Sequence, residues 1–204
     1  MALLHKQIDF GVELCCHSDK KLAFTGQKLV PVLCDDGRIV CDSWNIATHL
    51  DSTYPDRPLL LNEPTTRSFA KFMNKWTDTI VGRPLVRSLY LDIWRSLHPD
   101  ADADTFRSHR ETRNGATLEQ LRDRREHDFN EFNRALAPLN TMLLDQPYIA
   151  GNEPAYVDYI VFGTLQMPFH LGGIEPLSDE MSALREWRNK LRNHHDTLEN
   201  NRKR

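Results

Sequence analysis

The chain has 204 residues, of which 40% are hydrophobic and 27% are charged, a composition typical of a soluble globular protein with one or two compact domains. Its net charge of -3 argues against a nucleic-acid or anionic-membrane partner, because such partners select a clustered basic face. No apolar run approaches the ~18 residues that span a bilayer, and the apolar N-terminal stretch is too short for a signal peptide. We therefore expect a cytoplasmic protein.

Cysteine and histidine usage gives no support for a metal site. Four cysteines show neither a CxxC motif nor another zinc-ligand spacing, namely Cys15, Cys16, Cys34 and Cys41. An adjacent cysteine pair cannot easily bridge to itself, so the pattern favours a reducing compartment without disulfides. His194 and His195 are adjacent and have no evident third ligand, so we expect both on a solvated surface rather than on a metal ion.

Residues 1–54 combine strand and helix signals. An Asp36-Gly37 turn between two short β-branched runs predicts a hairpin within residues 28–41. Asp42-Ser43 then caps a helix whose apolar residues recur at helical spacing. This helix should end before Pro55, because proline disfavours helical geometry in the residue ahead of it. The sequence therefore predicts a small α/β unit at the N-terminal end.

Residues 55–64 are proline-rich and read as a linker, and residues 65–204 are almost entirely helical in pattern. A break or kink is expected at Gly82-Arg83-Pro84. Residues 98–115 are polar and irregular in pattern, apart from one helical turn near Phe106. The second unit should be a helical bundle.

Three further helices are expected in this bundle. A Thr117-Leu118-Glu119-Gln120 capping box opens a long helix whose core face extends from Leu118 to Leu143. Residues 160–165 are apolar on every side, so their helix should lie buried in the middle. A last helix is expected to start near Ser178, with Trp187 on its apolar face.

This order of elements, with V-P at a strand end, D-S at a helix start and a helical second half, resembles the glutathione transferases. In detail the chain looks most like the bacterial lignin β-etherases and the related fungal etherase-like class. The stretches that carry the resemblance are Val30-Pro31-Val32-Leu33, Asp42-Ser43-Trp44 with Ile46-Ala47, Tyr54-Pro55-Asp56-Arg57-Pro58, Gly115 to Leu121, Ile149-Ala150-Gly151-Asn152 and Asp158 to Gly163. The resemblance implies the glutathione-transferase fold, an incomplete thioredoxin-like domain (1–54), a linker (55–64) and an all-helical domain (65–204).

The resemblance also implies a glutathione site. Val30-Pro31 would be cis, and the backbone N–H and C=O of Val30 would pair with the cysteinyl backbone of glutathione like an added strand. Without the family, an edge-strand proline that prevents aggregation is the simpler interpretation, since only ~5–6% of such bonds are cis. The family often carries a basic or amide residue directly before V-P; here that position is Leu29, and Lys28 is the candidate contact to a glutathione carboxylate.

Asp42 and Ser43 have two interpretations. Aspartate and serine are among the commonest helix caps, which needs no ligand. A helix N-terminus also favours an anionic group, and in the family the γ-glutamyl end of glutathione lies there. We expect both roles together.

The family fold places a strand, a catalytic loop and a helix before the segment that begins here at Met1, so the resemblance implies an N-terminally truncated chain. The missing strand would lie between strands near 10–16 and 30–34. The missing loop would carry the Ser, Tyr or Cys that activates the sulfur. Cys15 and Cys16 align with the second strand instead, and buried strand cysteines are more often inert. No residue of this chain is therefore predicted to be catalytic.

One more departure from the family, and one group of candidate residues, concern the helical half. Ala155 stands where a Ser or Thr usually caps the buried helix, with Asp158 retained, and losing a hydroxyl cap costs roughly 0.5–2 kcal/mol. Trp76, Tyr90 and Trp94 lie on helices that in the family wall the second-substrate pocket, although aromatics at helical spacing are more often core.

The resemblance implies a transferase that binds glutathione as co-substrate, needs no metal, forms a homodimer and directs its thiolate at a small hydrophobic electrophile or an aryl ether. Two alternatives stay open. One is a non-catalytic binding module of the same fold, which Leu29, Ala155 and the absent loop favour. The other is a truncated gene product without a folded role.

Overall fold

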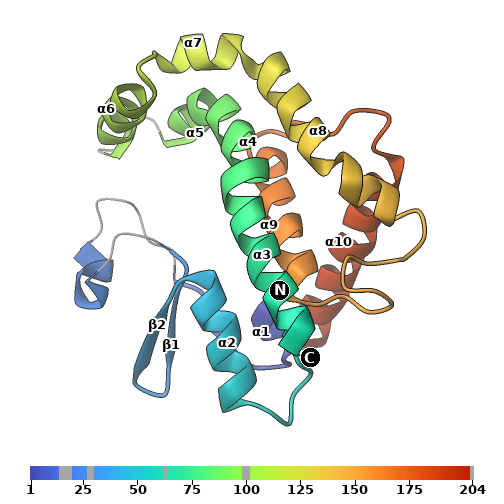
Figure 1. Cartoon of the computed structure of the whole chain (residues 1–204). Helices are drawn as coiled ribbons and strands as arrows, with labels where there is room; N and C mark the ends of the chain where they lie inside the picture. The colour runs from blue at the N-terminus through green and yellow to red at the C-terminus, as the bar shows by residue number, and fades with distance from the viewer. Residues whose placement is uncertain (14–19, 27–29, 62–63, 98–101, 203–204) are drawn as a thin grey trace.

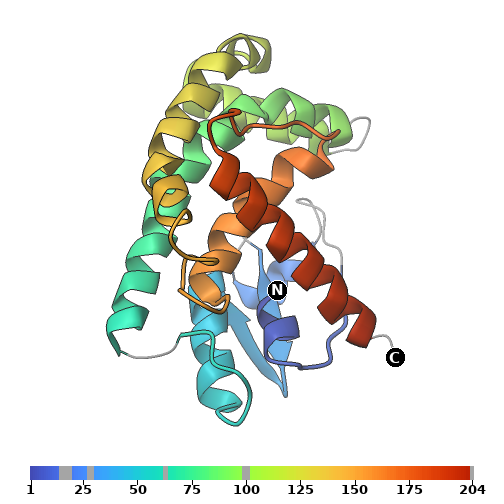
Figure 2. The ribbon, with the colours of Figure 1, turned by 90° about the vertical axis from the view of Figure 1, so that its right-hand side faces the viewer.

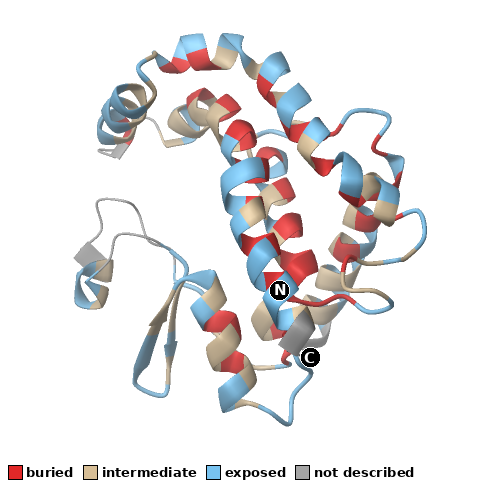
Figure 3. Ribbon diagram, in the orientation of Figure 1, coloured by how far each residue is buried: buried red, intermediate tan, exposed pale blue. Residues whose placement is uncertain are grey.

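The computed structural model describes residues 1–13, 20–26, 30–61, 64–97 and 102–202 (Figure 1). A small α/β unit lies beside a larger helical unit, which confirms the predicted fold class of an α/β domain followed by a helical bundle. Buried residues gather where the bundle helices meet, as Figure 3 shows. None of the helices in the described ranges is both long and apolar enough to cross a membrane.

The predicted hairpin is present. Strands β1 (Val32–Asp35) and β2 (Arg38–Cys41) pair antiparallel, with Val32 opposite Cys41. The two turn residues, Asp36 and Gly37, have φ of 44° and 77°, the positive values that a tight two-residue hairpin turn demands. The Asp36-Gly37 turn, which is evident in the sequence, therefore sets the register of the two strands.

The strand expected near residues 10–16 is not formed by residues 10–13, and residues 14–16 lie outside the described part of the chain. Within the described residues the sheet has two strands. A cavity of about 760 Å³ is lined both by residues 8–13 and by residues 30–35 at the start of the hairpin. Residues 10–13 do not have strand structure, so the prediction was wrong for these residues.

Helix α2 (Ser43–Thr53) follows the hairpin and ends at Tyr54 ahead of Pro55, as predicted. Two side chains near the C-terminal end of α2 form hydrogen bonds with Asp35, the last residue of β1. His49 Nε2 lies 2.6 Å from one carboxylate oxygen of Asp35, and the Tyr54 hydroxyl donates to the other oxygen at 2.6 Å. These bonds keep the pKa of Asp35 below its usual value, the Tyr54 bond contributing most. The C-terminal end of α2 is thereby fixed relative to the hairpin.

A buried ion pair joins the N-terminal helix to α2. Helix α1 (Ala2–His5) lies beside the last helix of the chain (Figure 2). Lys6 follows directly after α1, and its side chain is fully buried. Its Nζ donates to Asp51 of α2 at 3.0 Å. The same carboxylate accepts the backbone N–H groups of Leu60 and Leu61, at 3.0 and 2.7 Å. One aspartate thus ties together the N-terminal helix, α2 and the linker.

The remaining elements are helical. In chain order they are the 3₁₀ turn η1 (Lys20–Thr25), α3 (Pro64–Trp76), the π-helical segment η2 (Thr77–Val81), α4 (Gly82–Ser88), α5 (Tyr90–Leu97), α6 (Asp102–Asn114), α7 (Leu118–Asp123), α8 (Arg125–Met142), α9 (Tyr156–His170) and α10 (Ser182–Arg202). Helix α9 lies inside the bundle, with Val161, Phe162 and Leu165 buried, so the predicted central helix is confirmed.

Three predicted boundaries need correction, whereas the break expected at Gly82-Arg83-Pro84 lies where η2 ends and α4 begins. Residues 98–115, expected to be irregular, include the three-turn helix α6. The Thr117 capping box is present, but the helix breaks at Arg124 instead of running on. At the break near Gly82, the chain forms the π-helical segment η2, which ends at Val81. A Cβ atom added to Gly82 would lie 3.1 Å from the Thr77 carbonyl oxygen. The last helix starts at Ser182 rather than Ser178.

Candidate functional site

The segment ahead of β1 presents open backbone. The Val30-Pro31 peptide bond is cis, as the resemblance implied. Val30 is 67% exposed, and its backbone N–H and C=O make no hydrogen bond to any residue in the described ranges. Both residues line the cavity of about 760 Å³. An extended ligand can therefore reach a free donor and a free acceptor here.

Asp42 caps α2 in an unusual backbone conformation. Its carboxylate accepts the N–H groups of Trp44 and Asn45, at 3.0 and 3.2 Å. An ordinary N-cap residue has extended backbone with negative φ, whereas Asp42 has φ of 77°. A non-glycine residue in such a region costs of order 1–3 kcal/mol, and strain of this kind concentrates at functional sites. Capping alone does not account for this geometry.

Ser43 is the first residue of α2 and lies at the surface. Its hydroxyl is a neighbour of the buried Tyr156 hydroxyl, which donates to Asn74 Oδ1 at 2.6 Å. The Asn74 amide donates in turn to Asp78 at 2.7 Å. Burial raises the pKa of Tyr156 to about 12, and Ser43 acts in the opposite direction. A chain of hydrogen bonds thus runs from Tyr156, at the start of α9, through Asn74 to Asp78.

The hairpin register brings the predicted binding residues together. Because Val32 pairs with Cys41, Val30 and Pro31 precede the same end of the hairpin that Asp42 and Ser43 follow. Lys28, the fifth predicted contact, lies outside the described residues, as do Cys15 and Cys16.

The sulfur-activating group was predicted to be missing. Among the described residues that line the cavity there is no serine, threonine or tyrosine, and the polar side chains are those of Asp9, Glu13, Cys34 and Asp35. The described wall of the cavity therefore offers no hydroxyl to a bound sulfur.

The aromatic residues considered for a second-substrate pocket lie in packed surroundings. Tyr90 meets Phe106 edge to face at 6.0 Å, and the Arg107 guanidinium lies 5.0 Å from the centre of the Trp94 ring. Trp76 is half-buried against the main core. These contacts favour the core interpretation.

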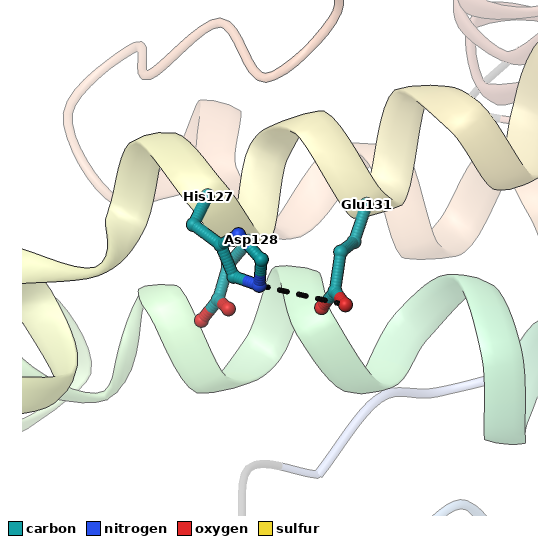
Figure 4. A group of neighbouring side chains, drawn as sticks. All are labelled: His127, Asp128 and Glu131. Atoms are coloured by element: carbon teal, nitrogen blue, oxygen red, sulfur yellow. Dashed lines mark ion pairs between the residues drawn. The ribbon is translucent and has the colours of Figure 1, made fainter.

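A histidine–carboxylate group with metal-like spacing lies along α8 (Figure 4). His127, Asp128 and Glu131 offer ligand atoms within 4.8 Å of one another and point toward α4. Asp128 is fully buried, and both its oxygens already accept from the Arg87 guanidinium, at 3.0 and 2.5 Å. Arg87 Nη2 also lies 3.3 Å from Glu131. The Arg87 guanidinium supplies the positive charge that a metal ion would otherwise supply to these carboxylates. The three residues therefore belong to an ion-pair network between α4 and α8.

His194 and His195 were expected on solvated surface, but both are half-buried. His195 Nδ1 lies 3.2 Å from Asp196, and burial lowers the pKa of His194. Both histidines keep part of their surface in solvent, and the side chain of His195 is 37% exposed.

Comparison with known families identifies the chain. A family model of the glutathione S-transferase N-terminal domain matches residues 1–58, and one of the C-terminal domain matches residues 68–194. The chain belongs to the glutathione S-transferase family. Glutathione S-transferase U22 of Arabidopsis thaliana is 28% identical over 137 residues, which are 67% of this chain and 50% of that protein. The chain therefore spans about half the length of this relative.

Solved glutathione transferases share the fold. The enzyme GSTFuA2 from Phanerochaete chrysosporium gives a TM-score of 0.75 at 21% identity, covering 98% of this chain and 86% of that one. CsGST63524 of Ceriporiopsis subvermispora, solved in complex with glutathione, gives 0.77 at 20% identity, with 98% and 87% covered. The β-etherase LigF from Sphingobium sp. strain SYK-6 gives 0.69 at 18% identity, with 93% and 87% covered.

Sequence reasoning missed Tyr156, Asn74 and Asp78. Tyr156 reads as one more apolar residue of a buried helix, and the other two read as polar positions on α3 and η2. The hydrogen bond between Tyr156 and Asn74 joins residues 82 positions apart, so no local sequence pattern reveals it.

Proposed function

We propose that this glutathione S-transferase family member binds glutathione through Val30, Pro31, Asp42 and Ser43, with Lys28 as a further contact. The observation that carries the proposal is the open Val30 backbone at the same end of the hairpin as the strained Asp42 cap. The free cysteines Cys34 and Cys41 suit the reducing cytoplasm where glutathione is abundant.

The geometry suggests how the tripeptide is held. Its cysteinyl backbone pairs with Val30 as an added strand. Its γ-glutamyl end takes the N-terminus of α2, where the Trp44 and Asn45 N–H groups are occupied by Asp42 but the Ser43 N–H is not. The thiol then lies over the cavity.

The reaction that we propose is attack by the glutathione thiolate on an electrophilic carbon of a small hydrophobic substrate. In the etherase version a carbon–sulfur bond forms, the carbon–oxygen bond of an aryl ether breaks, and the phenoxide leaves and takes up a proton. The motifs that resemble the etherase-like class motivate this version, and β-etherase LigF has the same fold.

A non-catalytic binding module is the second candidate. One specific observation favours it: the described cavity wall offers no hydroxyl group to lower the pKa of a bound thiol. Turnover of an aryl ether or of a chlorinated aromatic electrophile with glutathione excludes this candidate, whereas binding without turnover supports it.

Glutathione binding is tested by titration calorimetry of the whole chain. We expect the Ser43→Ala variant to bind glutathione about tenfold more weakly, because a hydrogen bond to a charged group contributes roughly 1.5–3 kcal/mol. The Ser52→Ala variant removes an exposed serine from the other end of α2 and should leave the affinity within twofold. Absence of glutathione binding by the unmodified chain would falsify the proposal.

We also propose a homodimer. The outer side of α3 and η2 exposes Phe69, Phe72 and Ile80, of which Phe72 is 62% exposed. Contiguous exposed apolar groups of this kind mark interaction surfaces. The Phe72→Glu variant should sediment as a monomer in analytical ultracentrifugation, whereas Leu144→Glu, at a position 68% exposed beyond α8, should not change the mass. A dimer that survives Phe72→Glu contradicts this surface.

A further inference from the structure

The His5 imidazole joins α1 to two other parts of the chain. Its Nδ1 lies 2.7 Å from the Tyr159 hydroxyl of α9, and its Nε2 lies 3.0 Å from the Leu59 carbonyl oxygen in the linker. The His5 and Tyr159 rings also meet edge to face, with their centroids 5.6 Å apart. One side chain therefore connects the N-terminal helix, the linker and the helical unit.

The two hydrogen-bond partners fix the tautomer of this imidazole. A carbonyl oxygen can only accept, so Nε2 carries a proton and donates it to Leu59. In a neutral imidazole the other nitrogen is then an acceptor, and the Tyr159 hydroxyl donates to Nδ1. Both ring nitrogens and the tyrosine proton are paired in this neutral form.

A second proton on His5 breaks this arrangement. Nδ1 becomes a donor, so the Tyr159 hydroxyl must turn its own proton away from the ring. Within the described ranges that hydroxyl has no hydrogen-bond partner besides Nδ1. Tyr159 is only 7% exposed, so its proton is left in a buried place without an acceptor, which is costly.

The surroundings of His5 also disfavour a positive charge. Burial lowers the pKa of His5 most, and the Leu59 carbonyl and Asp51 of α2 oppose that shift. His194 of α10 and Lys6 lower the pKa further, because they repel a cation at this place. The attraction from Asp51 is largely spent, since its carboxylate already accepts from the Lys6 ammonium at 3.0 Å.

The groups around His194 act in the same direction when the pH falls. Burial lowers the pKa of His194, Glu153 opposes the shift, and His195 adds to it. Glu199 of α10 attracts the Met1 amine across the same junction of α1 and α10. Protonation of His194 therefore adds a second positive charge beside α1 as His5 takes up its own.

We propose that His5 forms an acid-sensitive link: its neutral ring holds α1 and the linker against α9, and protonation of the ring loosens them. An unfolded histidine takes up its proton at about pH 6.5. Folded His5 takes it up only at a lower pH, so the stability that the link contributes is complete above about pH 6.5 and is lost as the pH falls below that value. This inference does not depend on glutathione binding.

The test is hydrogen exchange of the whole chain at pH 7.5 and pH 5.5, read by mass spectrometry with exchange times scaled to the intrinsic rate at each pH. In the unmodified chain, the opening constant of the peptide covering residues 1–8 should rise about five- to tenfold at the lower pH. In His5→Gln the side-chain amide can still donate to Leu59 but gains no charge, so the rise should stay within about twofold. His109→Gln, which replaces an exposed histidine on α6, should behave like the unmodified chain.

Tyr159→Phe tests the reason for the acid sensitivity. Without the hydroxyl, a proton on Nδ1 orphans no tyrosine proton, so the rise should fall to about threefold or less. A merely structural role for His5 would change the opening constants of His5→Gln equally at both pH values and leave their ratio as in the unmodified chain, which overturns the inference.

Nitrogen-15 NMR of the unmodified chain gives a second test that needs no variant to fold. His5 should have its proton on Nε2 at pH 7.5 and should titrate at a lower pH than the histidines of the urea-unfolded chain. A proton on Nδ1 at pH 7.5, or titration together with the unfolded histidines, overturns the inference.

Discussion

The Asp158→Ala variant is expected to lose most or all of its folding stability. Asp158 lies in the first turn of α9 and is fully buried, and its carboxylate accepts four hydrogen bonds. The donors are the backbone N–H groups of Ile149, Ala150 and Ala155 and the indole N–H of Trp187, at 2.7, 3.2, 3.1 and 2.8 Å. Burial raises the pKa of this carboxyl and the four donors oppose the shift, that of Trp187 most.

Alanine at this position leaves four donors, three of them buried, without an acceptor. Each such donor costs about 1–3 kcal/mol, so the total approaches or exceeds 4 kcal/mol. Net stabilities of ~5–15 kcal/mol leave little after such a loss. Urea denaturation followed by circular dichroism measures it. Asp145→Ala, an exposed aspartate just upstream, should change the unfolding free energy by less than about 0.5 kcal/mol. A loss below about 1 kcal/mol in Asp158→Ala would contradict this account.

The same aspartate explains how α9 starts without a hydroxyl cap. Ala155 has no side-chain oxygen, so it caps nothing, and the sequence correctly predicts that half of the capping interaction to be missing. Asp158 supplies the other half by accepting the Ala155 N–H. The sequence retains Asp158, but its partners Ile149 and Trp187 become evident only in the folded bundle.

Local chemistry explains which parts of the fold were predictable. The hairpin turn, the Asp42 cap and the end of α2 depend on residues within a few positions of one another. Helix α6 was missed because its face is polar, and ion pairs such as Arg107–Glu111 at 3.0 Å support it where apolar periodicity is absent.

The residues of the candidate site also divide into those that the sequence predicts and those that it does not. Val30 and Asp42 could be singled out from short motifs together with a family resemblance. Tyr156 and Asn74 could not, because their meeting is a property of how α9 packs on α3. A strand near residues 10–13 was predicted wrongly for a related reason: pairing depends on a neighbour and not on composition alone.

Replacing Asp51 with alanine should be the other most damaging change. It leaves the Lys6 ammonium buried with backbone carbonyls only, those of Tyr54 and Arg57 at 2.9 and 3.5 Å. It also removes the acceptor of two N–H groups in the linker. Breaking a buried pair from one side typically costs 3–5 kcal/mol, so we expect a loss of about that size in urea denaturation.

Lys6→Met distinguishes the two contributions. Methionine fills a similar volume without a charge, and Asp51 keeps its bonds to Leu60 and Leu61, so this variant should lose about 1–2 kcal/mol less than Asp51→Ala. Glu186→Ala breaks an exposed ion pair with Lys190 and should cost no more than about 0.5 kcal/mol. Equal losses in Lys6→Met and Asp51→Ala would mean that the ion pair alone matters. Asp51→Ala should lose more stability than Lys6→Met because the Asp51 carboxylate accepts from three donors. These are the Lys6 ammonium after α1 and two backbone N–H groups of the linker.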